Sequence, residues 1–313
     1  MSPRRAREGL ALSRRLVLPA LATTLAAPRG SQAQGGRPLV VASFSILGDM
    51  VRQIAGDGGV ALRVLAGPDT DAHAFQPRPS DAEAVRGAAV VVRNGLGFEP
   101  WLDRLLRGAS HRGVVATATE GIAAIRATHG HGAGGAPDPH AWQDVQLART
   151  YAARIGEGLA KGDPPRAETW REGAAAYATR LEALDRHVRG RIAEVPPERR
   201  IVVTSHEAFG YFGAAYGVRF LAPQGIAAGA QPSAAQVAAL IRQIRAERVS
   251  AVFLDGPGSQ TLTERLAREA GVRPRGRLYA DTLSAPDGPA PGYEAMQRHN
   301  VELLVAAMRD EAA

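Results

Sequence analysis

Short apolar segments alternate with helical patterns in two series along the chain, and one long helical pattern separates the series. The apolar segments of the first series lie at 39–43, 61–66, 89–94 and 114–118, and those of the second at 200–205, 250–255 and 276–280. Alternation of this kind predicts mostly parallel sheets with helices on both faces. The expected fold class is α/β, with two βα lobes joined by one long helix.

The separating helix is unusually long for a small domain. Its pattern covers 164–193, and a pair of prolines at 196–197 ends it. Asp163 can cap this helix and Pro164 suits its first turn. At 1.5 Å per residue it would be roughly 45 Å long. We therefore expect an N-terminal lobe at 34–163, a connecting helix at 164–195 and a C-terminal lobe at 196–313.

Two capping-box patterns predict where other helices begin. Ser80 with Glu83, and Ser233 with Gln236, each place an N-cap serine three residues before a side chain that can reach back to it. We expect helices to start at these serines. A short helix is also expected from about residue 145.

Positive charge is concentrated in the first 33 residues. The formal net charge of the chain is +7, and these residues hold six arginines and one acidic residue, Glu8. The rest of the chain is close to neutral. It therefore gives no electrostatic footprint for a nucleic-acid partner.

The same N-terminal region is typical of an export signal. An arginine-rich start leads into LVLPALATTLAA, which is too short for a stable membrane anchor, and SQA at 31–33 resembles a small-residue cleavage site. Arg14 and Arg15 also fit a twin-arginine signal, so two export routes stay open. The chain has no cysteine, which excludes disulfides, a thiolate metal site and a lipid attachment site. We expect a signal peptide at 1–33 and a mature protein free in the periplasm.

Three histidines and one aspartate fall where predicted strands end. His73 lies beyond the second apolar segment of the first series, and His206 directly follows the first apolar segment of the second. Asp281 directly follows the last segment, and His140 lies in a proline-flanked loop, APDPHAW, after the first series. Ligands of open α/β sheets bind beyond the carboxyl ends of the strands. With two of these residues in each lobe, we expect all four to converge between the lobes.

Three imidazoles and one carboxylate suit tetrahedral Zn²⁺. No two of them have helical i, i+4 spacing, so tertiary folding must assemble such a site. Prolines stiffen two of the loops and reduce the entropy lost when a ligand is held at fixed geometry; they are Pro68, Pro77, Pro79, Pro137 and Pro139. An ordinary surface role for each histidine is the alternative that these patterns leave open.

Four segments resemble, in order, the signatures of one family. HAFQPRPSD, DPHAWQDV, TSHEAFGYF and YADTLS are similar to those of the metal-binding proteins of ABC importers for zinc and manganese. The resemblance implies two βα lobes bridged by one helix, with limited closure. It also implies that His73, His140, His206 and Asp281 bind the metal. The expected partner is a membrane permease with its ATPase, and the receptor itself is expected to be a monomer.

Position 206 bears on the metal. Manganese-type members of the family tend to have glutamate there and zinc-type members histidine, so His206 favours Zn²⁺, which imidazole suits. Some members with three histidines also take manganese, so a Mn²⁺ receptor of the same class is the alternative. Gln76 stands where glutamate is common in the family. The loop 129–135 is shorter than in many zinc members, and His129 and His131 either capture metal weakly or belong to a solvated loop.

Two other functions compete with uptake. A zinc-dependent hydrolase would use His73, His140 and His206 as ligands, with Asp281 or Glu207 as general base, but no HExxH motif is present. An exported metal buffer without a permease is the second.

Three neighbours of His140 have expected supporting roles. Trp142 is expected to pack beneath the His140 loop. Asp138 and Asp144 can orient an imidazole, but helix capping or turn formation is the preferred interpretation for both.

Overall fold

The computed structural model describes residues 36–126, 135–223, 225, 233–247, 249, 251–255 and 260–309. The compact body begins at Arg37. The predicted signal peptide and the loop residues His129 and His131 lie outside the described residues.

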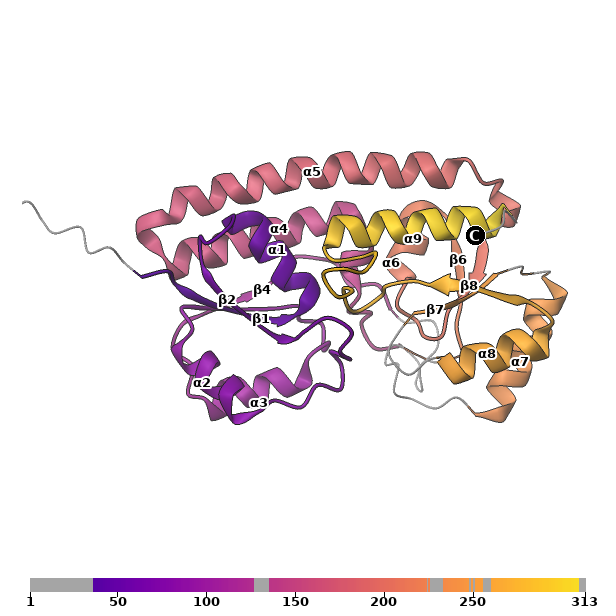
Figure 1. Ribbon diagram of the computed structural model, residues 1–313, viewed down its shortest axis with the longest axis horizontal. Coiled ribbons are helices and arrows are strands. Elements are labelled where there is room, and N and C mark those ends of the chain that lie inside the picture. The colour runs from indigo at the N-terminus through magenta and orange to yellow at the C-terminus, as the bar shows by residue number, and fades with distance from the viewer. Residues whose placement is uncertain are drawn as a thin grey trace, which may run out of the picture. The chain divides into compact units, whose positions relative to one another are not determined.

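The first four strands form a parallel sheet in the order β2-β1-β3-β4. They are β1 (Leu39–Phe44), β2 (Ala61–Ala66), β3 (Val90–Arg93) and β4 (Val114–Thr117). The helices of this half are α1 (Ser45–Ala55), α2 (Pro79–Gly87), α3 (Pro100–Gly108) and α4 (Val145–Gly162). Alternate side chains of β1 enter different clusters: Val40 and Ala42 pack with α1 and α4, whereas Val41 packs with α2 and α3. In Figure 1, α1 and α4 lie on one side of this sheet and α2 and α3 on the other. The sheet is therefore covered on both faces.

A second parallel sheet has the order β6-β5-β7-β8. Its strands are β5 (Ile201–Val203), β6 (Arg219–Leu221), β7 (Ala251–Leu254) and β8 (Arg273–Arg277). The helices of this half are α6 (Gly210–Tyr216), α7 (Ala234–Ala246), α8 (Gln260–Ala270) and α9 (Tyr293–Met308). The predicted α/β class with two parallel sheets is confirmed.

The last strand is displaced from its predicted position. We expected a strand at 276–280, whereas β8 has the sequence RPRGR and ends at Arg277. An edge strand pairs on one side only, and this one keeps much of its length exposed, so it needs no apolar run. Asp281 consequently does not follow the strand directly and belongs to the segment between β8 and α9.

One long helix, α5 (Ala167–Ala193), connects the halves and lies beside α4 (Figure 1). It follows a 3₁₀ turn at Pro164–Arg166. The helix predicted from about residue 145 does begin at Val145, but the prediction that it is short is wrong, because α4 has 18 residues. Its glycines permit close contacts: a Cβ on Gly156 would lie 2.6 Å from Cβ of Ala174 in α5, and one on Gly158 2.5 Å from Cβ of Ala116. Glycine, a helix breaker by propensity, serves here for packing.

One capping box is confirmed and the other is wrong. At α7, Gln236 Oε1 accepts a hydrogen bond from Ser233 N at 2.8 Å, and Ser233 Oγ accepts from Gln236 N at 3.3 Å. At α2 the helix begins at Pro79, and Asp81 Oδ2 accepts from Arg78 N at 2.9 Å. With a proline at the first helical position, the N-cap is Arg78, two residues before the expected Ser80.

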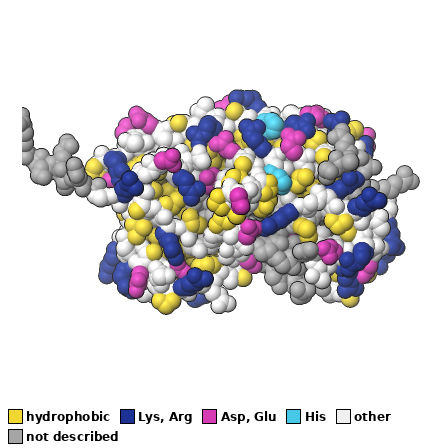
Figure 2. All heavy atoms as spheres, viewed as in Figure 1, with side chains coloured by type: hydrophobic (Ala, Val, Ile, Leu, Met, Phe, Trp, Pro, Cys, Tyr) yellow, Lys and Arg dark blue, Asp and Glu magenta, His cyan; other side chains and the backbone are white. Residues whose placement is uncertain are grey.

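Positive and negative side chains are interspersed over the face drawn in Figure 2. Among the described residues, no helix combines the length and the hydropathy that crossing a membrane requires.

Candidate metal centre

His73 lies in the loop after β2, and this loop is held from two sides. Asp71 Oδ1 accepts hydrogen bonds from the backbone N–H of His73 at 2.9 Å and of Ala74 at 3.2 Å. Trp101 Nε1, in α3, donates to the carbonyl of Ala72 at 2.8 Å. The His73 side chain is 12% exposed, the most of the four candidate ligands.

His140 is fully buried and is oriented by a carboxylate. Oδ1 of Asp138 lies 2.8 Å from His140 Nδ1 and also accepts from His140 N at 2.9 Å. An acceptor at Nδ1 keeps the proton there and leaves Nε2 free to bind a metal. Asn94, at the end of β3, donates from Nδ2 to the carbonyl of Pro139 at 2.9 Å and fixes the loop to the first sheet. Asp138 therefore does orient an imidazole, contrary to the preferred sequence interpretation.

His206 follows β5 and has its own buried carboxylate. Oδ2 of Asp255, at the end of β7, lies 3.1 Å from His206 Nδ1. Asp255 also accepts hydrogen bonds from the hydroxyl and the backbone N–H of Ser205, the latter at 3.1 Å. The opposite nitrogen, His206 Nε2, lies 2.9 Å from Asp281 Oδ2. Each half thus places a carboxylate beside Nδ1 of its imidazole, as a hydrogen bond at His140 and as a close ion-pair contact at His206.

The donor atoms of His73, His140 and Asp281 all lie within 4.8 Å of one another. His73 Nε2 is 3.3 Å from His140 Nε2 and 3.6 Å from Asp281 Oδ2, and His140 Nε2 is 3.3 Å from Asp281 Oδ1. Tetrahedral ligands with bonds of about 2.0–2.2 Å are roughly 3.3–3.6 Å apart. Asp281 Oδ1 is buried and has no hydrogen-bond partner among the described residues. The structure brings the four predicted residues together, with His206 joined to the other three through Asp281.

Burial lowers the pKa of the imidazoles, whereas nearby carboxylates raise it. Burial lowers the pKa of His73 to about 4, so this ring is neutral near pH 7. Burial also opposes a charged His140, but the carboxylates of Asp281 and Asp138 outweigh it and raise the pKa of His140. Metal binding at His140 therefore competes with protonation of this ring.

The pair of His206 and Asp281 shows the same opposition. Burial disfavours charge on both, yet Asp255 and Asp281 raise the pKa of His206 well above its usual value. The rings of His206 and His140 in turn hold the pKa of Asp281 well below its usual range. A carboxylate that stays ionised while buried is prepared to bind a cation.

Aromatic rings enclose the buried side of the cluster. Phe98 lies with its ring centroid 4.3 Å from that of His73, and Trp142 packs 5.2 Å from His140 and 5.0 Å from Phe98. The expected packing of Trp142 beneath the His140 loop is confirmed. Its Nε1 also donates to the carbonyl of Ala280 at 2.9 Å.

Sequence reasoning missed Asp255, Asn94 and Phe98. Asp255 and Asn94 each end an apolar strand segment, which is the signal that had marked His206. Asp144 has the capping role expected of it, because its carboxylate accepts from Gln146 N at 2.8 Å at the start of α4.

Comparison of the sequence with models of protein families assigns the chain to one family. The model described as "ZnuA: Zinc-uptake complex component A periplasmic" matches residues 40–307. The chain belongs to this family.

Relatives of this zinc-uptake component A family are named for several metals. Iron-binding protein YfeA of Yersinia pestis is 32% identical over 265 residues, which are 85% of this chain and 84% of YfeA. Manganese-binding lipoprotein MntA of Halalkalibacterium halodurans is 31% identical over 280 residues, 89% of this chain and 91% of MntA. The structure of the periplasmic zinc binding protein TroA of Treponema pallidum is similar with a TM-score of 0.81 at 29% identity, covering 87% of this chain and 99% of TroA. Family membership therefore identifies a metal receptor without fixing one metal.

The chain is thus an extracytoplasmic metal-binding receptor for an ABC importer. Zinc-uptake component A proteins are solute-binding proteins and not enzymes. The predicted family and the non-enzymatic role are confirmed, and the hydrolase alternative is set aside.

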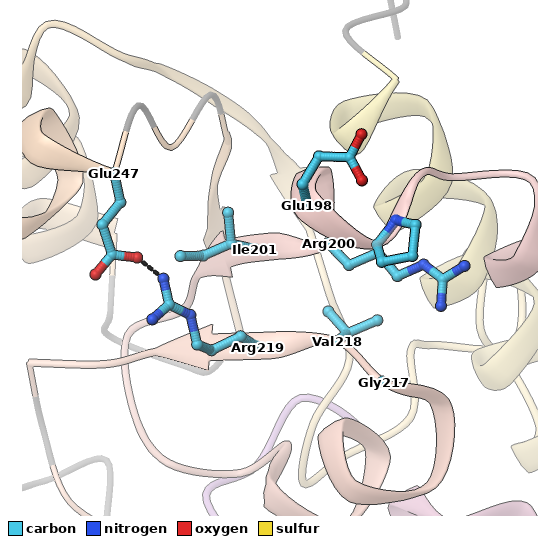
Figure 3. A pocket seen from close by; sticks show the side chains of 8 residues that line it. Glu198, Arg200, Ile201, Gly217, Val218, Arg219 and Glu247 are labelled. Atoms are coloured by element: carbon cyan, nitrogen blue, oxygen red, sulfur yellow. Dashed lines mark ion pairs between the residues drawn. The ribbon is translucent and has the colours of Figure 1, made fainter.

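A separate pocket of about 680 Å³ lies in the second half. Its lining includes Arg200 and Ile201 at the start of β5 and Val218 before β6, and Arg219 forms an ion pair with Glu247 on one side (Figure 3). These are the amino ends of the strands, whereas His206 follows a carboxyl end. The pocket is therefore separate from the cluster of His73, His140, His206 and Asp281.

Replacing either orienting carboxylate should weaken metal binding. Asp138→Asn and Asp255→Asn are each expected to lower zinc affinity by about 10- to 100-fold, because an uncharged amide makes the imidazole a poorer and less fixed donor. Competition with a chromogenic chelator measures the effect. Asp144→Asn, which changes a helix cap, is the matched control; an equal loss in that variant would contradict the orienting role.

Proposed function

We propose that this receptor binds Zn²⁺ with high affinity through His73, His140, His206 and Asp281, and delivers it to a membrane permease with its ATPase. The observation that carries the proposal is the nitrogen donor at position 206, whose Nε2 lies 2.9 Å from Asp281 Oδ2. Three imidazoles and one carboxylate suit zinc better than the harder Mn²⁺. The resting receptor is proposed to be monomeric.

A manganese or mixed-metal receptor is the second candidate, and the iron and manganese relatives favour it. The two candidates make different predictions for one measurement. Apo protein is titrated with Zn²⁺, Mn²⁺ and Fe²⁺ in competition at one pH. A preference for manganese over zinc would overturn the zinc assignment and leave the receptor class intact.

Zinc should stabilise the folded protein, and this effect should grow with pH. At a hundredfold excess of zinc over Kd the gain is about 2.7 kcal/mol. The raised pKa values of His140 and His206 mean that the apo protein is stabilised by protons below an unfolded-state pKa of about 6.5. That stabilisation is lost as pH rises through the folded-state values, while zinc meets less proton competition.

The zinc-induced rise in Tm is therefore expected to be larger at pH 8 than at pH 6. If zinc binding releases one or two protons, zinc affinity should rise by about 10- to 100-fold for each unit of increasing pH. Calorimetry in buffers of different ionisation enthalpy counts the protons. A Tm shift that does not change between these pH values would contradict proton displacement, and the absence of any shift at pH 8 would contradict zinc binding.

A further inference from the structure

The segment that carries Asp281, residues 280–292, is bonded mainly to the first half of the molecule. The carbonyl of Ala280 accepts from Trp142 Nε1 and from Gln143 Nε2, both at 2.9 Å. Ser45 Oγ, at the start of α1, accepts from Leu283 N at 3.0 Å. The residues on both sides of Asp281 are thus held by α1 and by the turn that follows His140.

Two further bonds extend this attachment along the segment. The carbonyl of Leu283 accepts from Asp69 N at 3.2 Å, in the loop that leads to His73. One turn beyond Ser45, Asp49 Oδ2 accepts from Tyr293 N at 2.8 Å and caps the start of α9. Both Ser45 and Asp49 are at most 5% exposed, so these bonds are shielded from water.

Bonds to the second half stop just before the segment. Leu278 N donates to the carbonyl of Leu254 at 2.7 Å, and Tyr279 exchanges two hydrogen bonds with Asn300 in α9, at 2.9 and 2.7 Å. Among the described residues, the direct bond between the segment that starts at Ala280 and a strand or loop of the second half is the one between Asp281 and His206. Hydrogen bonds to the second half therefore extend as far as Tyr279, and hydrogen bonds to the first half begin at Ala280.

We propose that His73, His140 and Asp281 form one unit on the first half, and that metal release begins when the second half moves away with His206 alone. This rests on the proposed function. His206 is fixed to its own half by Asp255 and reaches the other three through its bond to Asp281. Bonds from α6 also join the two halves and must break in the movement: Tyr211 OH donates to the carbonyl of Asp138 at 3.1 Å and accepts from Ile125 N at 3.2 Å, and Tyr216 OH accepts from Val145 N at 3.1 Å. Ser45 and Asp49 are positioning residues, because they act through Asp281.

Distances between spin labels test whether the segment that carries Asp281 moves with the first half. The chain has no cysteine, so pairs of labels can be placed uniquely. Three exposed sites serve: Asp57→Cys in the first half, Asp287→Cys in the segment and Arg268→Cys in α8. Comparing zinc-bound with zinc-free protein by pulsed electron spin resonance, we expect the 57–287 distance to stay constant while the 57–268 and 287–268 distances change.

Two outcomes would overturn the proposal that the segment moves with the first half. One is a constant 287–268 distance with a changed 57–287 distance. The other is no change in any distance although calorimetry shows zinc binding. Absence of zinc binding in the calorimeter would instead overturn the proposed function. The two failures are therefore distinguishable.

A kinetic variant tests the positioning role. Ser45→Ala removes the acceptor of Leu283 N, and we expect zinc to dissociate about 10-fold faster, with a broader 57–287 distance distribution. Ser45→Thr keeps the hydroxyl and should restore the slow rate. Ser284→Ala is the matched control, because Ser284 Oγ is also buried but bonds within the segment, to Ala285 and Ala290. Equal acceleration in the Ser45→Ala and Ser284→Ala variants would contradict the role.

Discussion

Replacing His140 with alanine is expected to lower zinc affinity by more than about 100-fold, which is the upper range for losing only an outer partner of a ligand. His140 is fully buried and its Nε2 lies 3.3 Å from donor atoms of both His73 and Asp281. The variant therefore loses a donor at the centre of the cluster. Water entering the space replaces a well-oriented imidazole with a weaker ligand.

The measurement is a competition titration with a chelator of known affinity, accompanied by the zinc-induced change in Tm. His187→Ala is the control, since His187 lies on α5 with its Nε2 3.6 Å from Glu302. An affinity that stays within tenfold of wild type in His140→Ala would remove His140 from the binding site.

Exchanging His206 for glutamate should have two separable effects. The ratio of zinc to manganese affinity should fall, because an imidazole is replaced by an oxygen donor that Mn²⁺ prefers. The preference for zinc over manganese is expected to become smaller and not to reverse, since divalent-metal sites generally bind Zn²⁺ more tightly than Mn²⁺. The apo protein should also lose stability, because the new carboxylate would face Asp255 where an imidazole nitrogen now lies 3.1 Å from it.

The double variant His206→Glu with Asp255→Asn separates these effects. Removing the second carboxylate should restore the Tm of the apo protein and keep the narrowed metal preference. Paired competition titrations and melting curves on wild type, both single variants and the double variant provide the comparison. A zinc-to-manganese ratio that is unchanged or larger with glutamate would show that residue 206 does not bind the metal directly.

The parallel sheets could be predicted because apolar runs such as LVVAS and RIVVTS are local patterns of buried strands. Residues that follow such strands reach one edge of a sheet, which accounts for His73 and His206. The place of His140 and Asp281 beside them was expected mainly from the family resemblance. The strand RPRGR escaped prediction because an exposed edge removes the need for apolar residues. The length of α4 escaped because Gly156 and Gly158 are explained by contacts with α5 and β4, which are distant in sequence.

The attachment of Asp281 also could not be predicted from spacing. Its position in the chain assigns it to the second half, which led us to expect two ligands from each lobe. The bonds that hold its segment join residues more than 130 positions apart, such as Trp142 with Ala280 and Ser45 with Leu283. Nothing in the local sequence of YADTLS indicates partners so remote, and only the folded arrangement identifies them.

The unequal exposure of the four side chains has a consequence for how an ion loses its hydration shell. The side chains of His73 and Asp281 are 12% and 9% exposed, whereas those of His140 and His206 are fully buried. At the proposed site, an arriving aqua ion would meet His73 and Asp281 first, while most of its water is still bound. It would lose the remaining water against the buried rings, beside Phe98 and Trp142. We therefore expect dehydration in two smaller steps, and we expect the second step to disfavour an ion that holds its water tightly, such as Mg²⁺.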